Sequence, residues 1–170
     1  MISPAESPSQ GPVRKGESNP MPNQRSSARL AAVQALYQLE LSGGIADDVI
    51  EGFFEIHQGA VLGVDGPDSA PADQEFFRML SQGVSDQMVA VDRVLADTLK
   101  NQMVERLDVI LRAILRAGSY ELMSQKQIPA RVIISEYLDL AHAFFGGSEP
   151  KLVNGVLDKI AQGLRPDEFK

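Results

Sequence analysis

Residues 107–124 have the sequence LDVILRAILRAGSYELMS, which is the clearest helix pattern in the chain. Large apolar residues recur in it at intervals of three and four and would form one wide stripe on a helix. The polar residues between them are expected to face away from that stripe. The stripe consists of Leu107, Ile110, Leu111, Ile114, Leu115 and Leu122, and the polar residues are Asp108, Arg112, Arg116 and Ser119. The pattern predicts an amphipathic helix that packs against other helices.

Downstream of this segment the sequence predicts two more helices. Pro129 follows Ile128 and suits the first position of a helix, so one helix ends and the next begins there. That next helix ends at the glycines of residues 146–147. Ser148 and Pro150 then provide an N-cap and an early proline for a last helix, which ends near residue 163.

Upstream, the helical pattern begins at Ser27, with Ser26 or Ser27 as the N-cap, and ends at the glycine pair of residues 43–44. A second helix is predicted from about Ala46, and residues 59–71 are predicted to form a loop. A long helical stretch follows over residues 72–100. Gly83 interrupts it, and a kink or break is expected near that glycine.

These patterns predict the fold class. Hairpin signals and regular alternation of apolar and polar residues are missing from the sequence. We therefore expect an all-α fold of about six or seven helices packed as bundles, in a domain that covers residues 25–165.

The first 24 residues differ in character from the rest. They hold five of the ten prolines of the chain and have no apolar periodicity. Such a segment cannot bury enough surface to offset the entropy lost on ordering, so we expect residues 1–24 to be a disordered tail. Met21 lies just before the structured part and is a candidate for the true start of translation.

Composition excludes several classes of protein. The chain has 170 residues and no cysteine, which excludes disulfides, thiolate catalysis and metal sites built on sulfur. The two histidines, His57 and His142, lie far apart, so no metal site and no cofactor is predicted. The sequence contains neither a run of 18 apolar residues nor a secretory signal, so we expect a cytoplasmic protein without a membrane span.

Charge is distributed unevenly along the chain. The net charge is −7, which argues against coating of nucleic acid by bulk charge. Residues 41–100 hold eleven acidic residues against three basic ones, whereas residues 1–40 hold four basic residues against three glutamates. The acidic stretch is either a solvated face or a surface that repels nucleic acid.

The sequence indicates a binding protein rather than an enzyme. It contains no phosphate-binding P-loop, no dinucleotide fingerprint and no nucleophile elbow. Paired carboxylates such as Asp47 and Asp48 are better explained as charges in the first turn of a helix. We therefore predict no catalytic residues.

Two local features remain as candidate sites. Arg25 and Arg29 lie four residues apart at the entry of the first helix and would share a face that suits phosphate. Asn154 and Gly155 interrupt an apolar helix, which usually has a packing or functional cause. For Gly155 we expect close helix–helix packing, and for Asn154 a buried hydrogen bond rather than direct contact with a ligand.

Three segments resemble the NusB family of transcription antitermination factors. The first runs from Arg29 to Tyr37 with the sequence RLAAVQALY. The second runs from Ile114 to Leu122 and is followed by Ile128-Pro129. The third, KLVNGVLD from Lys151 to Asp158, is the most specific motif. The resemblance covers about residues 25–162, in matching order and spacing.

The resemblance implies a fold and a function. The fold would consist of two small helical bundles. The function would be binding of boxA, a single-stranded RNA element, together with NusE, a protein of the small ribosomal subunit. The complex would help RNA polymerase to resist termination, notably on ribosomal RNA operons. The basic partner NusE would bind the exposed face of helix 107–124 and the adjacent end of the acidic helix.

The resemblance also suggests residues of the site. Family members often carry a run of arginines before the first helix, which is thinned here to Arg25 and Arg29. An aromatic residue of the last motif is replaced by Leu152, which removes one stacking surface. If the first and last helices start close together, a compact RNA-binding patch forms. It would consist of Arg25, Arg29, Gln34, Lys151 and Leu152, while Tyr120, Pro129, Asn154 and Gly155 would have structural roles.

Two alternatives stay open from the sequence. One is a helical scaffold for protein interactions without a role on RNA. The other is a detached module of an RNA cytosine methyltransferase, since such enzymes carry a NusB-like domain at their front. RNA binding at moderate salt would separate the first alternative from the main hypothesis.

Overall fold

The structure is a computed structural model that describes residues 24–57 and 72–170. Within these ranges it consists of seven α-helices and two short 3-10 helices, without a strand. The α-helices are α1 (Gln24–Ser42), α2 (Ala46–His57), α3 (Gln74–Asp86), α4 (Met88–Leu99), α5 (Val109–Ser124), α6 (Ala130–Phe144) and α7 (Glu149–Leu164). The 3-10 helices are η1 (Val104–Arg106) and η2 (Pro166–Phe169). The prediction of an all-α fold is confirmed.

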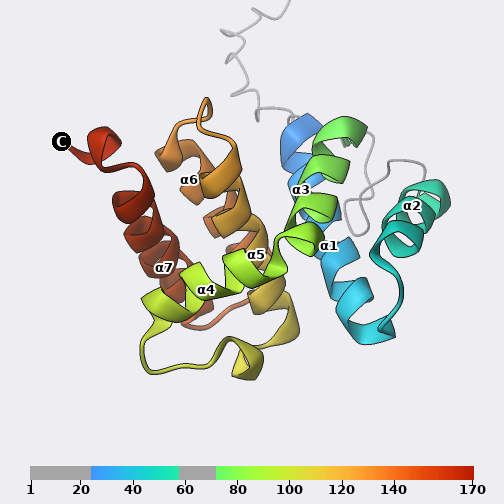
Figure 1. The fold of residues 1–170 in the computed structure, drawn as a ribbon, viewed down its shortest axis with the longest axis horizontal. Helices are drawn as coiled ribbons and strands as arrows, with labels where there is room; N and C mark the ends of the chain where they lie inside the picture. The colour runs from blue at the N-terminus through green and yellow to red at the C-terminus, as the bar shows by residue number, and fades with distance from the viewer. Residues whose placement is uncertain (1–23, 58–71) are drawn as a thin grey trace, which may run out of the picture.

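Helix α5 lies at the centre of the molecule. Helices α1, α2 and α3 lie on one side of it and helices α4, α6 and α7 on the other (Figure 1). Its side chains Ile114, Leu115 and Leu122 are completely buried. The two groups of helices therefore form two small bundles that share α5, and burial of its apolar stripe holds them together.

Both ends of α5 are closed by polar side chains. At the start, the Asp108 carboxylate accepts hydrogen bonds from the backbone N–H groups of Ile110 and Leu111, at 2.9 and 3.3 Å. At the end, the guanidinium of Arg165 donates to the carbonyls of Leu122 and Gln125, at 2.8 and 2.9 Å. A chain segment that follows α7 thus satisfies carbonyls that the end of α5 leaves open.

Two polar residues of α5 do not face away from the core as predicted. Ser119 is completely buried and Arg112 is 7% exposed. The Arg112 guanidinium donates to the carbonyls of Val104 and Glu105 in η1, at 3.2 and 2.9 Å. It also forms an ion pair with Glu40 of α1. Arg112 can lie inside because these carbonyls and the Glu40 carboxylate take the place of the water molecules that would otherwise solvate its charge.

The break in the long helical stretch falls at Gln87, between α3 and α4, and not at Gly83. Gly83 lies within α3, where the ring of Tyr120 from α5 packs against it. A Cβ atom at Gly83 would lie 2.2 Å from Tyr120 Cζ. The break predicted near Gly83 thus occurs four residues later, and the glycine itself permits a close approach of two helices.

The first helix begins earlier than predicted. Gln24, assigned to the tail, is the first residue of α1, and its carbonyl accepts a hydrogen bond of 2.9 Å from the Asp73 N–H. Ser26 is not an N-cap, because its hydroxyl donates to Glu136 of α6. The rest of the predicted tail, Met21 and the loop predicted at 59–71 lie outside the described residues. Gly43 has a φ of 63° at the end of α1, as the sequence predicted.

The end of the chain is tied to the turn between α5 and α6. The Glu168 carboxylate in η2 accepts a hydrogen bond of 2.7 Å from the Ala130 N–H at the start of α6. This bond, together with the neighbouring Arg165 guanidinium, lowers the pKa of Glu168. The structured part thus extends beyond the predicted domain end at residue 165.

Candidate functional site

Arg29, one of the two arginines predicted to contact phosphate, lies in the interior. Its side chain comes from the second turn of α1 and the residue is 2% exposed. Its Nε and Nη2 donate to the Glu121 carboxylate of α5, at 3.0 and 2.6 Å. The predicted exposed pair of Arg25 and Arg29 does not form, because Glu121 draws Arg29 into the core.

A small polar network surrounds this ion pair. The Tyr137 hydroxyl of α6 donates to Glu121 at 2.7 Å, and Glu136 lies 3.7 Å from Arg29 Nη1. Burial raises the pKa of Tyr137 well above its ordinary value, and the charge of Glu121 adds to this effect. Burial acts to lower the pKa of Arg29, but its bond to Glu121 and the charge of that residue raise it overall. The network joins α1, α5 and α6 and is structural in character.

Arg25 remains at the surface, one turn before Arg29. Its guanidinium carbon lies 5.0 Å from the ring centroid of Phe76 in α3. Arg29 approaches the same ring at 5.0 Å. Phe76 therefore orients both arginines through cation–π contacts, one exposed and one buried.

Gln34 and Tyr37 line a groove between α1 and the ends of α5 and α6. The groove has a volume of about 550 Å³ and mostly apolar walls. Phe53, Ile110 and Phe144 contribute to it, and Tyr37 is 36% exposed. Phe144 is the last residue of α6. The sequence does not indicate that Phe144 lies beside Tyr37, because this proximity depends on how α6 crosses α1.

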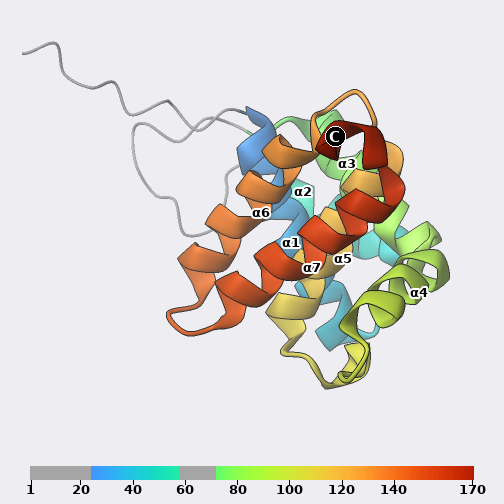
Figure 2. The ribbon, with the colours of Figure 1, turned by 90° about the vertical axis from the view of Figure 1, so that its left-hand side faces the viewer.

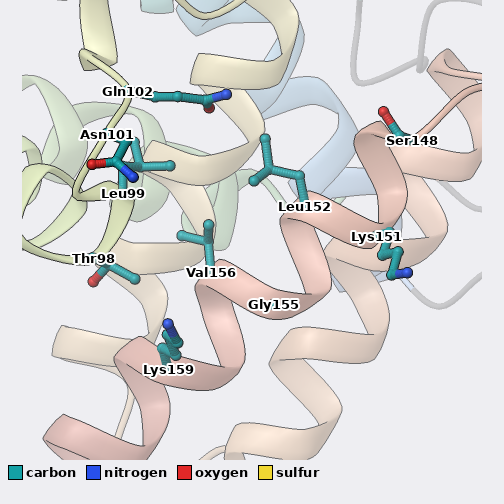
Figure 3. Close-up of a pocket in the computed structure, with 10 residues that line it drawn as sticks. All are labelled: Thr98, Leu99, Asn101, Gln102, Ser148, Lys151, Leu152, Gly155, Val156 and Lys159. Carbon is teal, nitrogen blue, oxygen red and sulfur yellow. The ribbon is translucent and has the colours of Figure 1, made fainter.

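Lys151 and Leu152 line a second groove, between the end of α4 and α7. Its volume is about 530 Å³, and Figure 3 shows residues of α7 along one wall and the turn after α4 along the other. Lys151 is exposed and Leu152 is partly buried. This groove and the one beside Tyr37 lie on either side of the turn between α6 and α7, since Phe144 lines one and Ser148 the other.

The predictions for the motif residues of α7 were wrong. Asn154 is exposed and therefore makes no buried hydrogen bond. Gly155 is also exposed, and a Cβ atom there would meet no atom within 4 Å. The close packing expected for Gly155 occurs instead at Gly118 of α5, where a Cβ would lie 2.9 Å from Leu157 Cδ1.

Tyr120 and Pro129, the other predicted structural residues, flank the end of α5. Tyr120 is 8% exposed against Gly83. Pro129 is the N-cap residue of α6, one position before its predicted place. The carbonyl of the preceding Ile128 accepts a bond of 2.6 Å from Arg165.

The compact patch predicted from sequence is not present in the structure. Arg25 lies at the start of α1 beside α3, whereas Lys151 lies at the start of α7 beside the end of α4. Figure 2 shows these two helix starts apart, with α6 between them. Gln34 lines a separate groove. The predicted residues are distributed over three places because α1 and α7 run in different parts of the fold.

Helix 107–124, on which a surface for NusE was predicted, has no open face in the structure. Helices α1, α3, α4, α6 and α7 all pack against α5. Eleven of its sixteen residues are buried. A docking protein would meet the helices around α5 rather than α5 itself.

The described residues show neither a metal centre nor a membrane span. Among them, no three histidine, aspartate or glutamate side chains form a group that could hold a metal ion. None of the helices in these ranges is long and apolar enough to cross a bilayer.

Comparison with known proteins identifies related chains. The model of the NusB family matches residues 26–162. A transcription antitermination protein NusB from Maricaulis maris is 47% identical over 149 residues, which are 85% of this chain and 90% of that protein. The same protein from Rhodopseudomonas palustris (strain HaA2) is 47% identical over 162 residues, covering 93% of this chain and 92% of the relative. These relatives are named as antitermination proteins, in agreement with the prediction that the chain is not an enzyme.

Solved structures show the same fold. NusB from T. maritima superposes with a TM-score of 0.69 at 28% identity, covering 85% of this chain and 96% of that one. The NusB fold is also found in a complex of antitermination factors NusB and NusE with dsRNA. That chain has a TM-score of 0.67 at 23% identity, covering 82% of this chain and 97% of its own length.

Proposed function

This chain belongs to the NusB family, and from that premise we propose that it is a transcription antitermination factor that binds boxA-type RNA together with NusE. The RNA is single-stranded, and the complex acts on RNA polymerase at ribosomal RNA operons in the cytoplasm. The observation that carries the proposal is the match to named antitermination proteins over 90% or more of their length. A match of this extent favours the whole factor over a detached methyltransferase module.

The two grooves beside the turn between α6 and α7 form the RNA surface in this proposal. The groove beside Tyr37 supplies aromatic rings on which bases stack, and Gln34 supplies an amide that can hydrogen-bond a base edge. Lys151 holds a phosphate, and Leu152 gives an apolar contact beside it. Arg25 contributes a further positive charge at the start of α1.

Arg29 acts on RNA only indirectly in this proposal. Its guanidinium binds Glu121 and lies near Glu136, and the Arg29 side chain is 3% exposed. It fixes the first turns of α1 against α5 and α6. Arg25 and Tyr37, on the outer face of the same helix, are thereby held in position.

NusE, as a basic ribosomal protein, would meet the acidic part of the surface. Exposed carboxylates of this kind include Asp86 at the end of α3 and Asp97 in α4. Asp92 is less accessible to a partner, because its carboxylate is held by Arg116 at 2.8 Å. The acidic surface would then lie on α3 and α4, and it would adjoin the RNA surface at the end of α4, where Thr98 and Leu99 line the groove.

A titration of fluorescent boxA-type RNA tests the proposal. The protein is added alone and with NusE, and binding is followed by anisotropy. We expect tight binding that requires or is strengthened by NusE. A folded protein that binds NusE but no RNA would overturn the proposal in favour of the scaffold alternative.

Lys126, in the turn before α6, and Lys151, in the first turn of α7, provide a matched pair for locating the RNA. Lys151 follows α6 and Lys126 precedes it, and both side chains are exposed. Lys151→Ala should weaken RNA binding several-fold through loss of a phosphate contact, whereas Lys126→Ala should leave it unchanged. Equal effects of the two substitutions would place the RNA elsewhere.

A further inference from the structure

The groove between α4 and α7 has a regular basic wall. Lys151, Gly155 and Lys159 follow one another at four-residue intervals and all line the groove. Residues with this spacing share one face of a helix, about 6 Å apart along its axis. Figure 3 shows Gly155 between the two lysines on α7. Gly155 therefore leaves a notch between two positive charges, and no atom lies within 4 Å of where its side chain would begin.

The opposite wall presents amides. The chain turns sharply after α4 at Lys100, which has a φ of 50°, and the Asn101 N–H donates to the Leu99 carbonyl at 2.5 Å. Lys100 is the sole non-glycine residue with positive φ among the described residues. This tight turn places Asn101 and Gln102 on the groove, across from α7 (Figure 3). Strained turns of this kind tend to occur where a side chain is held for a purpose.

Between the walls the floor is apolar. Leu99 is 9% exposed and Val156 is 5% exposed, and Leu152 packs on the core beside them. A volume of about 530 Å³ lies within the usual range of small-ligand sites. The floor suits the flat face of an apolar ring, and the amides at the edge of the groove can form hydrogen bonds in the plane of that ring.

We propose that this groove is a nucleotide subsite of the RNA-binding surface, which takes one unstacked base of a single strand. The base lies on Leu99 and Val156, its edge meets the amides of Asn101 and Gln102, and Lys159 holds a flanking phosphate. The inference rests on the proposed function and deepens it, because it adds contacts beyond Lys151 and Leu152.

Charge favours RNA over a basic protein as the occupant. The residues that line the groove include two lysines and no acidic residue, although the chain as a whole carries a net charge of −7. Asp158, the acidic neighbour of Lys159, accepts a hydrogen bond of 2.7 Å from Gln162 further along α7. The groove is also continuous with the proposed RNA surface, since Lys151 and Leu152 belong to both.

Two glycines of α7 allow a controlled test. Gly155→Leu fills the notch, whereas Gly163→Leu adds the same side chain near the end of the helix, outside the groove. Neither added Cβ would meet an atom within 4 Å, so both variants are expected to fold. Thermal unfolding followed by circular dichroism verifies this before any RNA is added.

Binding is measured by anisotropy on a boxA-type RNA and on a series in which each base in turn is removed. For the wild-type protein with NusE, loss of one particular base should weaken binding about tenfold. Gly155→Leu should weaken binding of the intact RNA to a similar degree. In this variant, removal of that same base from the RNA should cause no further loss of affinity. Lys159→Ala should weaken binding about threefold at low salt. Gly163→Leu should behave as the wild type.

The outcomes separate this inference from the proposed function. A wild-type protein that binds no RNA would overturn both. Wild-type RNA affinity in Gly155→Leu, with the same response to every missing base, would overturn the subsite alone. Loss of NusE binding in Gly155→Leu with unchanged RNA affinity would also overturn it, because the groove would then serve the protein partner.

Discussion

At the scale of single residues, the interior ion pair of Arg29 and Glu121 has the largest expected effect on stability. Both side chains are almost fully buried, at 3% and 0% exposure. A buried charge without its partner is costly, because neither water nor an opposite charge then compensates it. Arg29 thus contributes to function through the folded state rather than by touching a ligand.

Glu121→Gln should lower the free energy of unfolding by about 3–5 kcal/mol, because it removes the buried counter-charge of Arg29 and leaves only the more distant Glu136, at 3.7 Å. Urea unfolding followed by circular dichroism measures the change. Glu51→Gln is the control, since it breaks the exposed ion pair with Arg78. The control should change stability by less than about 1 kcal/mol. Similar losses in the two variants would contradict a special role of the buried pair.

The hydroxyl of Tyr137 gives the same network a pH dependence. Its pKa lies above the ordinary value of 10.0 in the folded protein, so the folded state keeps a proton that the unfolded chain releases. Stabilisation from this group is therefore complete below about pH 10 and is lost as the pH rises further. The wild type should lose stability between about pH 9.5 and 11 more steeply than Tyr137→Phe, in urea unfolding at each pH. Tyr37→Phe, which removes the hydroxyl of an exposed tyrosine, is the matched control.

At the scale of helices, the glycines of α3 and α7 have opposite roles. Gly83 lies under the ring of Tyr120, whereas Gly155 faces open space. Alanine favours a helix interior over glycine by about 1 kcal/mol when nothing else changes. The atoms around each glycine therefore decide whether its replacement by alanine raises or lowers the free energy of unfolding.

Gly155→Ala should raise the free energy of unfolding by about 0.5–1 kcal/mol. Gly83→Ala should lower it by about 1–3 kcal/mol, because the Tyr120 ring must move to admit a methyl group. Thermal unfolding compares the two variants. In a Tyr120→Leu background the penalty of Gly83→Ala should shrink, and an undiminished penalty would mean that contact with the ring is not its cause.

At the scale of the whole molecule, RNA affinity should depend on salt only moderately. Arg25, Lys151 and Lys159 are the basic side chains proposed to approach phosphates, and Arg29 is excluded by its burial. Three contacts to a single strand predict a slope of about −2 for the logarithm of affinity against the logarithm of salt concentration. Anisotropy titrations of the complex with NusE over a range of salt measure this slope. A flat response would contradict phosphate contacts of this kind.

Local patterns were sufficient to predict the helices and the fold class. The apolar stripe of α5, the glycine at residue 43 and the proline before α6 act over a few residues, so the sequence shows them directly. The position of Arg29 could not be predicted in this way. Its partner Glu121 lies 92 residues away, and nothing near Arg29 distinguishes it from a surface arginine.

The candidate site was predicted less well than the fold for the same physical reason. The angles at which α4, α6 and α7 cross their neighbours decide which residues face each other across a groove. Helix periodicity in the sequence does not specify these angles. Lys151 was found through its motif, but Lys159, Asn101 and Phe144 were not. The exposure of Gly155 was missed because a glycine in an apolar helix can reflect either tight packing or an open notch.

The contact between Tyr120 and Gly83 also gives the protein a built-in optical probe. The chain has no tryptophan and three tyrosines, so tyrosine dominates its ultraviolet emission. Tyr120 reports on the junction of α3 with α5, and Tyr137 on the junction of α5 with α6, beside a carboxylate that its hydroxyl contacts. Replacing one or the other by phenylalanine would let spectroscopy follow separation of the two bundles from α5 independently, without an attached dye.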